Sequence, residues 1–302
     1  MTQGHTGRAD SWPGVAVIIV SADSGPLLET CIANVLASPL PQCVQLFDNA
    51  SRDGVAQRIE QKHKDDARLH VACSSRNLGF GAAVNRAAKG LTSDWLLILN
   101  PDVLLPPADL ERLMSIAASN DDAGLIGAVM VDQDGTVDPA SRRRDPLLRR
   151  SLAQLGFGSG ETVDDASPIP ASVIEVEAVS GALMLVRRSL LRRIGGFDEQ
   201  YFLHFEDLDL CRRVRDAGSR VLLAGELRVV HVQGSSSHHR PVFVAWHKHR
   251  GMWRWFRQHD PAARSWLASA LVWPGIWLHF LVQLPAMLWS SPRADARAMP
   301  GA

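Results

Sequence analysis

Cysteine is scarce in this sequence, and its spacing excludes the sites that cysteine usually builds. The four cysteines are scattered along the chain as Cys31, Cys43, Cys73 and Cys211. They form no CxxC pair and no Cys/His cluster with zinc spacing. A disulfide scaffold and a structural zinc site are therefore not indicated, and the pattern favours buried thiols in a reducing compartment.

Three further absences narrow the class of protein. The formal net charge is +0, so the overall charge does not indicate nucleic acid as a partner. Residues 1–14 contain no apolar run, which argues against a cleaved secretory signal. The chain also has no GxGxxG motif and no Walker lysine, so dinucleotide-binding and P-loop sites are not supported.

What the chain does have is an alternation of strand-like and helix-like segments over residues 15–100. Continuous apolar runs such as "VAVIIV" predict strands that are buried on both faces. Between them lie amphipathic segments, of which 27–36 has a clear helical stripe. This alternation predicts an α/β fold with a doubly wound, mostly parallel sheet.

The regularity falls after residue 100. Strands are expected at 125–131 and again in "VEAVSGALMLVRR", and two more short strands in "RVLLAG" and "LRVVHV". Residues 138–170 are polar and rich in Gly, Pro and Arg, and predict a long loop or flap. Its arginine-rich part, 141–150, would either bind acceptor phosphates or lipid head groups, or be a solvated basic loop.

Polar side chains follow each of the four predicted strands, and ligands of parallel sheets bind beyond the carboxyl ends of the strands. These residues are Ser21, Asp23, Asp48, Asn49, Arg76, Asn77, Asn100 and Asp102. Together they favour a polar ligand such as a nucleotide, although capping and turn chemistry would also explain them. Asn100 and Asp102 would share one face of an extended segment, as oxygen ligands of Mg²⁺ or Mn²⁺. "NLGFGAAVNRA" adds glycines before a helix, where backbone can approach a phosphate.

The stretch "FLHFEDLDLCRRVRDAG" crowds acidic residues at the start of a predicted helix. Acids are favoured there by the helix dipole, and the spacing of Asp209 and Arg213 predicts a surface ion pair. The apolar, aromatic segment before Glu206 and Asp207 would raise the proton affinity of a neighbouring carboxylate, which suits a general base. His231 ends an apolar strand, where a histidine is more often a core residue than a ligand.

Four later histidines fall in a basic stretch and are interpreted as surface residues: His238, His239, His247 and His249.

The C-terminal part has a different composition. Seven of the nine tryptophans lie at or after Trp246, and residues 266–289 carry no charged side chain. This segment is long enough to span a bilayer and follows a basic stretch, but Pro274 and Pro285 would kink it. Spanning the membrane, lying in its interface and forming a buried helical hairpin all remain open.

The motifs together resemble one family. "VIIVSADS", "LFDNASRDG", "NLGFGAAVNRA", "LLILNPDV", the block from "VSGALMLVRR" to "RRVRDAG", and "VVHVQGSSS" occur in family order over residues 15–237. The chain resembles the family 2 inverting glycosyltransferases of the GT-A fold, in particular the bacterial rhamnosyltransferase-like branch. The expected organisation is an N-terminal tail (1–14), a GT-A domain (15–237) and a basic, Trp-rich helical membrane-associating segment (238–302).

The resemblance also implies roles for individual residues. Asp207 would be the general base and Glu206 would support it or contact the acceptor. Asp102 would hold Mg²⁺ or Mn²⁺, completed by His231. The donor nucleotide would contact Ser21, Asp23, Asp48, Arg76, Asn77, Gly79 and Asn100, and the sugar or acceptor would contact Ser180, Gly181 and His204. Two departures stand out: Ala22-Asp23 replaces the family's aromatic-Asn pair, and Asn-Pro-Asp replaces Asp-x-Asp.

The implied reaction is transfer of rhamnose or a related hexose, with inversion, from a dTDP- or UDP-linked donor. The acceptor would be a glycan or a polyprenyl-diphosphate-linked sugar in cell-surface polysaccharide synthesis. The expected location is the cytoplasmic face of the bacterial inner membrane. The rivals are a nucleotidyltransferase with the same sheet and a non-catalytic nucleotide-sugar-binding scaffold. The nucleotidyltransferase is disfavoured because it would need a basic loop after the first strand, and "SADSGPLLE" contains no Lys or Arg.

Overall fold

The protein is described by a computed structural model that covers residues 13–157, 160–232 and 240–290. Within this part of the chain, one sheet has the strand order β3-β2-β1-β4-β8-β6-β9-β5, with β7 also paired to β9. The strands are β1 (Val15–Ser21), β2 (Pro41–Asp48), β3 (Leu69–Cys73), β4 (Trp95–Leu99), β5 (Val103–Leu104), β6 (Ala123–Val131), β7 (Val173–Glu175), β8 (Leu183–Arg187) and β9 (Arg220–His231).

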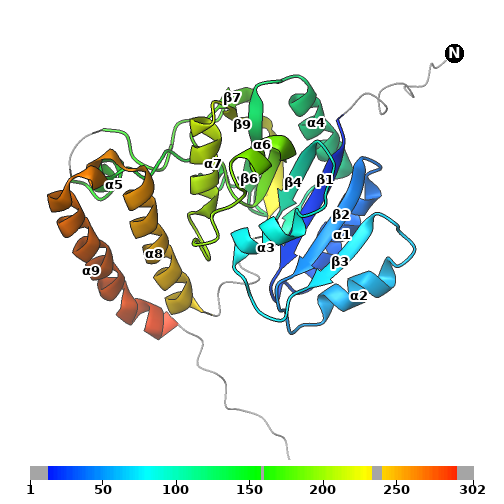
Figure 1. Ribbon diagram of the computed structural model, residues 1–302, viewed down its shortest axis with the longest axis horizontal. Coiled ribbons are helices and arrows are strands. Elements are labelled where there is room, and N and C mark those ends of the chain that lie inside the picture. Colours follow the sequence, from blue (N-terminus) through cyan, green and yellow to red (C-terminus); the bar gives the residue numbers. More distant parts are fainter. Residues whose placement is uncertain (1–12, 158–159, 233–239, 291–302) are drawn as a thin grey trace, which may run out of the picture.

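Helices cover both faces of the sheet, as predicted for a doubly wound α/β fold (Figure 1). Alternate residues of β1 pack against two separate core clusters, one on each face. The helices of the first cluster are α1 (Leu27–Ala37), α2 (Val55–Lys62) and α4 (Pro107–Ala118). Those of the second are α3 (Phe80–Ala87), α6 (Arg188–Arg193) and α7 (Glu206–Asp216).

The half of the sheet from β3 to β4 is parallel, and its register fixes where the polar strand ends lie. Ser21 pairs with Asp48 across β1 and β2, and Asp48 pairs with Cys73 across β2 and β3. The strand-end residues therefore meet at one rim. Beyond β4 the sheet becomes mixed, because β8 runs antiparallel to both β4 and β6.

Two predicted short strands form a single strand, β9. The pairing with β6 jumps from Ala128↔Ala224 to Val129↔Arg228, so the residues between Ala224 and Arg228 bulge out and the ladder then continues. A side chain at Gly225 would meet Pro170 O at 2.0 Å, so the bulge packs closely on the preceding segment. The expected strand break is thus a bulge that keeps both halves in one ladder.

Residues 138–157 and 160–167, which we name the strap, are ordered by ion pairs and are not a solvated basic loop. The strap contains a short 3₁₀ turn (Pro139–Ser141) and helix α5 (Leu148–Gln154). Arg150 is buried and bonds Glu177 at 2.7 and 2.8 Å. Two arginines of α7, Arg212 and Arg215, bond Asp145. The interpretation of 141–150 as a solvated loop is therefore wrong, since acids inside and outside the strap neutralise its arginines.

Helix α8 (Pro241–His259) packs on the loop that precedes α7. Trp255 is 1% exposed and belongs to the second core cluster. Tyr201 donates its hydroxyl to Gln258 at 2.8 Å, and Arg254 Nε donates to Asp198 at 2.9 Å. Phe202 stacks on His247 with ring centroids 4.5 Å apart. Helix α8 therefore supports the loop from which α7 begins.

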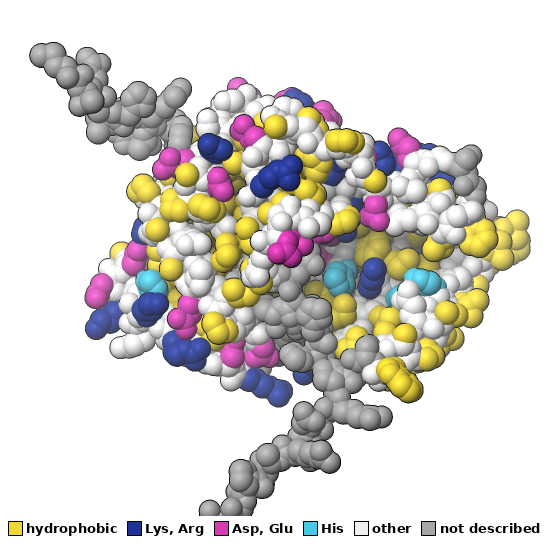
Figure 2. Space-filling view, turned by 180° about the vertical axis from the view of Figure 1, so that it is seen from behind, with side chains coloured by type: hydrophobic (Ala, Val, Ile, Leu, Met, Phe, Trp, Pro, Cys, Tyr) yellow, Lys and Arg dark blue, Asp and Glu magenta, His cyan; other side chains and the backbone are white. Residues whose placement is uncertain are grey.

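Helix α9 (Trp266–Ser290) follows a 3₁₀ turn (Pro261–Arg264) and returns along α8 (Figure 1). Among the described residues, the segment Trp266–Trp289 is the one helix long and apolar enough to cross a membrane, and little of it is buried. Its exposed apolar side chains gather at the right edge of Figure 2. The alternative of a buried helical hairpin is wrong, because most of α9 faces outward.

The prediction that His249 is a surface residue is also wrong. His249 is 2% exposed, and its Nε2 lies 3.0 Å from Nδ1 of His279 on α9. This contact ties α9 to α8. His238 and His239 lie outside the described residues.

Candidate functional site

The part of the rim predicted to bind the nucleotide is built by β1, β2 and the loops that follow them. Ser21 and Asp48 are buried, and Ser21 donates its hydroxyl to Asp48 Oδ1 at 3.0 Å. Asp23 has a left-handed backbone (φ 53°), and its Oδ1 accepts the Arg52 N–H at 2.6 Å. The predicted nucleotide contacts Ser21, Asp23 and Asp48 therefore lie on adjoining segments.

Asn49 organises this rim, where the sequence predicts it beside Asp48 at a strand end but gives it no separate role. It is 3% exposed, and its amide oxygen accepts the Leu78 N–H at 2.8 Å. Its amide nitrogen donates to Asn77 Oδ1 at 3.0 Å and to Gly79 O at 3.3 Å. A short polar residue directly after a buried strand was the available signal. Arg76 and Asn77 are exposed beside this crosslink.

Gly79 lies in the loop between β3 and α3, and it contacts the loop before α7. Its φ is 84°, and a side chain there would meet Phe202 O at 2.7 Å. The next residue, Phe80, donates its N–H to the same carbonyl at 3.1 Å. The close approach requires glycine both for its backbone conformation and for the space. The glycine-rich segment thus packs against protein backbone at this point.

The "NPD" segment forms a turn, so the prediction that Asn100 and Asp102 share a face of an extended segment is wrong. Val103 N–H donates to Asn100 O at 3.2 Å, which closes the turn. The turn leads into β5, where Val103 pairs with His231 of β9. As a result, His231 Nε2 lies 3.2 Å from Asp102 Oδ1.

The two predicted metal ligands are thus in contact, and two of their buried atoms, one of them the Asp102 Oδ1 that faces His231 Nε2, fit a cation. Asp102 Oδ1 and His231 Nδ1 are buried and make no hydrogen bond to the described residues. Carboxylate oxygen and imidazole nitrogen are suitable ligands for Mn²⁺, and the oxygen also for Mg²⁺. No group of three or more His, Cys, Asp or Glu side chains with metal-binding geometry occurs in the described residues.

The start of α7 is set by two consecutive left-handed residues, His204 (φ 65°) and Phe205 (φ 72°). These conformations are costly for residues other than glycine and cluster at functional sites. His204 is exposed. The turn places Glu206 and Asp207 in the first turn of α7, as the sequence predicts.

Glu206 and Asp207 have different surroundings. Glu206 is 8% exposed, and its Oε2 makes no hydrogen bond within the described chain. Burial, with the charge of Asp207 as the second cause, raises the pKa of Glu206 to about 8. Glu206 is therefore protonated at neutral pH and can donate a hydrogen bond.

Asp207 is held by three donors. Its Oδ1 accepts the Leu208 N–H at 2.8 Å, and its Oδ2 accepts the Gly181 N–H at 3.2 Å. Its Oδ2 also accepts a hydrogen bond from Arg143 of the strap. The Asp207 side chain is 14% exposed, so it remains open on one side. Sequence reasoning missed Arg143, because it lies 64 residues away and local patterns do not report such contacts.

Hydrogen bonds connect the Asn100–Val103 turn, which carries the predicted metal ligand Asp102, to Asp207. Asn100 N–H donates to Ala182 O at 2.8 Å, and Gly181, one residue earlier, donates to Asp207. Ser180 is buried and accepts the Ala182 N–H at 3.3 Å. The predicted donor-metal side and the predicted base are therefore linked through residues 180–182.

Asp209 has a structural role in the same helix turn. It bonds Arg213 as predicted, but it is 1% exposed, so the predicted surface pair is in fact buried. Its Oδ1 also lies 2.8 Å from His259 Nε2 of α8. Asp209 thus ties α7 to α8.

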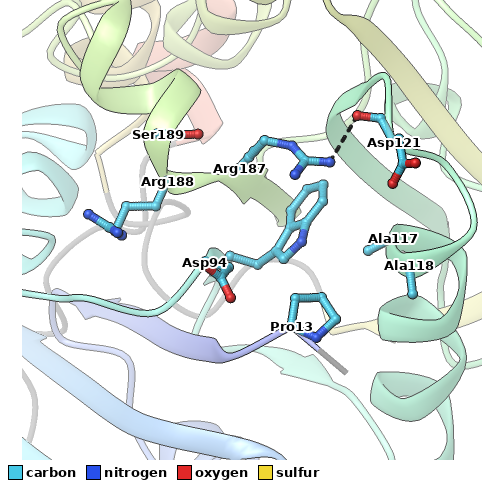
Figure 3. A pocket seen from close by; sticks show the side chains of 9 residues that line it. Pro13, Asp94, Ala117, Ala118, Asp121, Arg187, Arg188 and Ser189 are labelled. Atoms are coloured by element: carbon cyan, nitrogen blue, oxygen red, sulfur yellow. Dashed lines mark hydrogen bonds between the residues drawn. The ribbon is translucent and has the colours of Figure 1, made fainter. Parts of the chain in front are cut away.

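A cavity of about 310 Å³ lies elsewhere, at the edge where β1 and β4 begin. Figure 3 shows it between Pro13, Asp94 and Arg187, with Arg187 bonded to Asp121 O. In a parallel sheet the ligand site lies at the opposite edge, beyond the carboxyl ends of the strands. This cavity is therefore separate from the candidate active site.

Known proteins share the sequence and the fold. The model of the glycosyltransferase-like family 2 matches residues 13–257. The chain is 32% identical over 284 residues to N-acetylglucosaminyl-diphospho-decaprenol L-rhamnosyltransferase of Mycobacterium tuberculosis, covering 83% of this chain and 91% of the relative. It is 28% identical over 204 residues to the rhamnosyltransferase WbbL of Escherichia coli, covering 62% and 77%.

Solved structures agree on the fold. A mannosyltransferase from Pyrobaculum calidifontis, solved with GDP-Man and Mn²⁺, has a TM-score of 0.58 at 19% identity, covering 97% of this chain and 78% of that one. GalNAc-T7, solved with UDP, GalNAc and Mn²⁺, has a TM-score of 0.57 at 14% identity, covering 74% and 44%. The match favours glycosyl transfer over both rival functions. The chain therefore belongs to the glycosyltransferase-like family 2 and has the GT-A fold.

Proposed function

We propose that this protein is an inverting rhamnosyltransferase that uses dTDP-rhamnose and a lipid-linked acceptor. The named activity of the Mycobacterium tuberculosis relative supports the sugar and the decaprenyl-diphosphate acceptor. The dTDP nucleotide is supported by a further relative, the dTDP-rhamnosyl transferase RfbF of Shigella flexneri, which is 22% identical over 187 residues and covers 59% of this chain and 57% of the relative. A UDP-linked hexose is the alternative donor.

The main support in the structure is the path of hydrogen bonds from the Asn100–Val103 turn to Asp207. It links the predicted metal and diphosphate side to the predicted base through the 180–182 segment. A single displacement requires the leaving group and the base on opposite sides of one sugar, held in fixed geometry. The strand ends and the α7 turn supply these two sides.

In the proposed reaction, Asp207 takes the proton of an acceptor hydroxyl as that oxygen attacks the anomeric carbon. A new carbon–oxygen bond forms as the bond to the nucleoside diphosphate breaks, and the diphosphate leaves with the electron pair. The configuration inverts because attack occurs from the opposite face. Protonated Glu206 would donate a hydrogen bond to the acceptor and help orient it.

Asp102 and His231 would hold Mg²⁺ or Mn²⁺, as their contact and their unpaired atoms suggest. The ion would stabilise negative charge on the diphosphate as a Lewis acid. Ser21, Asp23 and Asp48 would bind the nucleoside, with Arg76, Asn77, Gly79 and Asn100 along the donor rim. Ser180, Gly181 and His204 would line the sugar and acceptor.

We assign the membrane contact to α9. The long apolar helix with little burial fits a bilayer or its surface, and the lipid-linked acceptor would lie in that bilayer. The expected location is the cytoplasmic face of the bacterial inner membrane, where nucleotide sugars are made.

The test of the proposed function is transfer by purified full-length protein from dTDP-rhamnose to N-acetylglucosaminyl-diphospho-decaprenol in detergent, with Mg²⁺, Mn²⁺ or EDTA. Metal-dependent formation of the rhamnosylated lipid is expected. Thermal shifts with dTDP, UDP and GDP would report the nucleotide independently of the acceptor, because a ligand that binds the folded state raises Tm. A shift with UDP but not dTDP would contradict the proposed donor.

Replacement of the proposed base gives a second test. Asp207→Asn should lower kcat about 100-fold or more, while the dTDP-rhamnose affinity stays close to that of the wild type, since the base acts in the transition state. Asp216→Asn is the matched control, because Asp216 lies at the other end of α7 and is half exposed. Near-normal turnover of Asp207→Asn would remove Asp207 from the mechanism.

A further inference from the structure

Arg143 differs from the other paired arginines of the strap in what it contacts. Arg142 bonds Asp165 and Ser167, and Arg144 pairs with Asp165, all within the strap. Arg150 bonds Glu177 and Glu161. Arg143 instead reaches α7 and donates to Asp207, the proposed base. The other arginines fix the strap itself, whereas Arg143 contacts the catalytic turn.

The backbone around Arg143 is held rigidly. Arg143 N–H donates to Ala178 O at 3.0 Å, and Ala178 N–H donates back to Arg143 O at 3.1 Å. This pair lies just before the 180–182 segment, whose Gly181 N–H also contacts Asp207. On the other side, Asp145 is fixed by Arg212 and Arg215. The guanidinium therefore approaches Asp207 from a fixed frame.

The contact limits the orientations that the Asp207 carboxylate can adopt. Arg143 and the Gly181 N–H both bind Oδ2, and the Leu208 N–H binds Oδ1. A side chain at Gly181 would come within 3.1 Å of Asp207 Cβ, so the carboxylate packs closely against this backbone. With Oδ2 engaged twice, Oδ1 has the greater capacity left to accept a proton.

We propose that Arg143 is a positioning residue, which fixes the orientation of the Asp207 carboxylate for proton transfer. This inference rests on the proposed function, in which Asp207 is the base. The buried Arg143 Nε makes no hydrogen bond within the described chain, so the guanidinium has no competing acceptor at that atom.

The electrostatics agree with this role. Burial lowers the pKa of Arg143, but the charge and hydrogen bond of Asp207 outweigh burial, and the pKa stays above its ordinary value. The other groups that interact with Asp207 are Glu206 and Cys211 on α7 and His204 before it, and Lys248 of α8 interacts with His204. Arg143 is the cation that bonds Asp207 directly.

The test compares Arg143→Met, Arg143→Lys and Arg144→Met in the transfer assay with dTDP-rhamnose and N-acetylglucosaminyl-diphospho-decaprenol. Arg144→Met makes the same change on the same strap without contact to α7. For Arg143→Met we expect kcat to fall about 10- to 100-fold with an unchanged KM for dTDP-rhamnose.

Arg143→Lys keeps the charge and should restore part of the turnover. The inference is overturned if Arg143→Met keeps the wild-type kcat, or if its kcat and KM match those of Arg144→Met. Absence of transfer by the wild type would overturn the proposed function and the inference with it. Transfer by the wild type with no specific effect at Arg143 would overturn the inference alone. Thermal melts of each variant separate loss of folding from loss of positioning.

Discussion

Glu206 and Asp207 are adjacent in the chain, but the surroundings of their carboxylates differ. Glu206 is buried with one unpaired carboxylate oxygen, whereas Asp207 accepts three hydrogen bonds, one of them from an arginine. Pairs of acids whose environments differ in this way can divide the roles of acid and base. The protonated form of Glu206 beside Asp207 also avoids two negative charges in one helical turn.

The raised pKa of Glu206 predicts how stability depends on pH. Because the folded state holds this proton up to about pH 8, while an unfolded glutamate releases it near its ordinary value, stability should fall as pH rises between the two. The Glu206→Gln variant has no titratable side chain at this position, so its Tm should fall less than that of the wild type between about pH 5.5 and about pH 8.5. The difference should reach roughly 5 °C in thermal melts.

Glu226→Gln is the control for this change, because Glu226 is exposed on β9. Its Tm curve should run parallel to that of the wild type. If the Glu206→Gln curve also ran parallel, Glu206 would be ionised in the folded protein and the proposed hydrogen bond to the acceptor would be lost.

At this scale the sequence predicts the acids but not their partners. Glu206, Asp207 and Asp102 stand out because each follows an apolar segment at a strand end or helix start. Arg143 and Asn49 do not stand out, since one lies in a polar stretch and the other resembles an ordinary turn residue. Their roles come from tertiary contacts, which a local pattern does not contain.

At the scale of elements, the contact between the β3–α3 loop and the loop before α7 depends on Gly79. Gly79→Ala would strain the backbone at φ 84° and push against Phe202 O. Because Phe202 lies just before the left-handed turn at His204 and Phe205, we expect the change to displace the start of α7. Transfer activity should fall at least about tenfold, with a lower Tm.

Gly90→Ala separates the effect of backbone strain from the effect of the contact with Phe202. Gly90 has a similar φ of 86°, but a side chain there would meet nothing within 4 Å. The control should therefore lose stability through backbone strain alone and keep its activity. Equal activity loss in both variants would show that the contact between Gly79 and Phe202 does not control the site.

Elements were predicted best where one local pattern dominates. The apolar strands β1 and β4 and the acidic start of α7 follow directly from the sequence. The sequence predicts two strands in place of β9, because Gly225 resembles a strand break. In the structure the pairing with β6 continues beyond the bulge. The strap resembled a loop, because its order comes from ion pairs between distant residues such as Arg150 and Glu177.

At the scale of the whole molecule, the alternation of strands and helices was enough to predict the α/β class. The position of α8 could not be predicted, because its basic and aromatic residues suit a membrane surface as well as a protein interface. In the structure, Trp255 enters the core and Arg254 bonds Asp198, while the exposed apolar side chains of α9 lie on the outer side of the pair. The two C-terminal helices therefore have separate roles.

This separation predicts the result of shortening the chain. A protein that ends at Ser265 keeps α8 and loses α9, so it should fold with a Tm close to that of the full chain. It should no longer sediment with vesicles of phosphatidylcholine and phosphatidylglycerol, because the long apolar helix is gone. Transfer to vesicle-embedded N-acetylglucosaminyl-diphospho-decaprenol should fall at least about tenfold, while the same reaction in detergent is retained.

A protein that ends at Arg240 is the informative comparison, since it also loses α8. It should unfold or aggregate, because Trp255 leaves a core cluster and Tyr201 loses Gln258. If the chain ending at Ser265 still bound vesicles, α9 would not be the membrane contact. The exposed apolar residues Leu155 and Phe157 after α5 would then be the next segment to test, since the start of α5 is bonded to Asp260 at the end of α8.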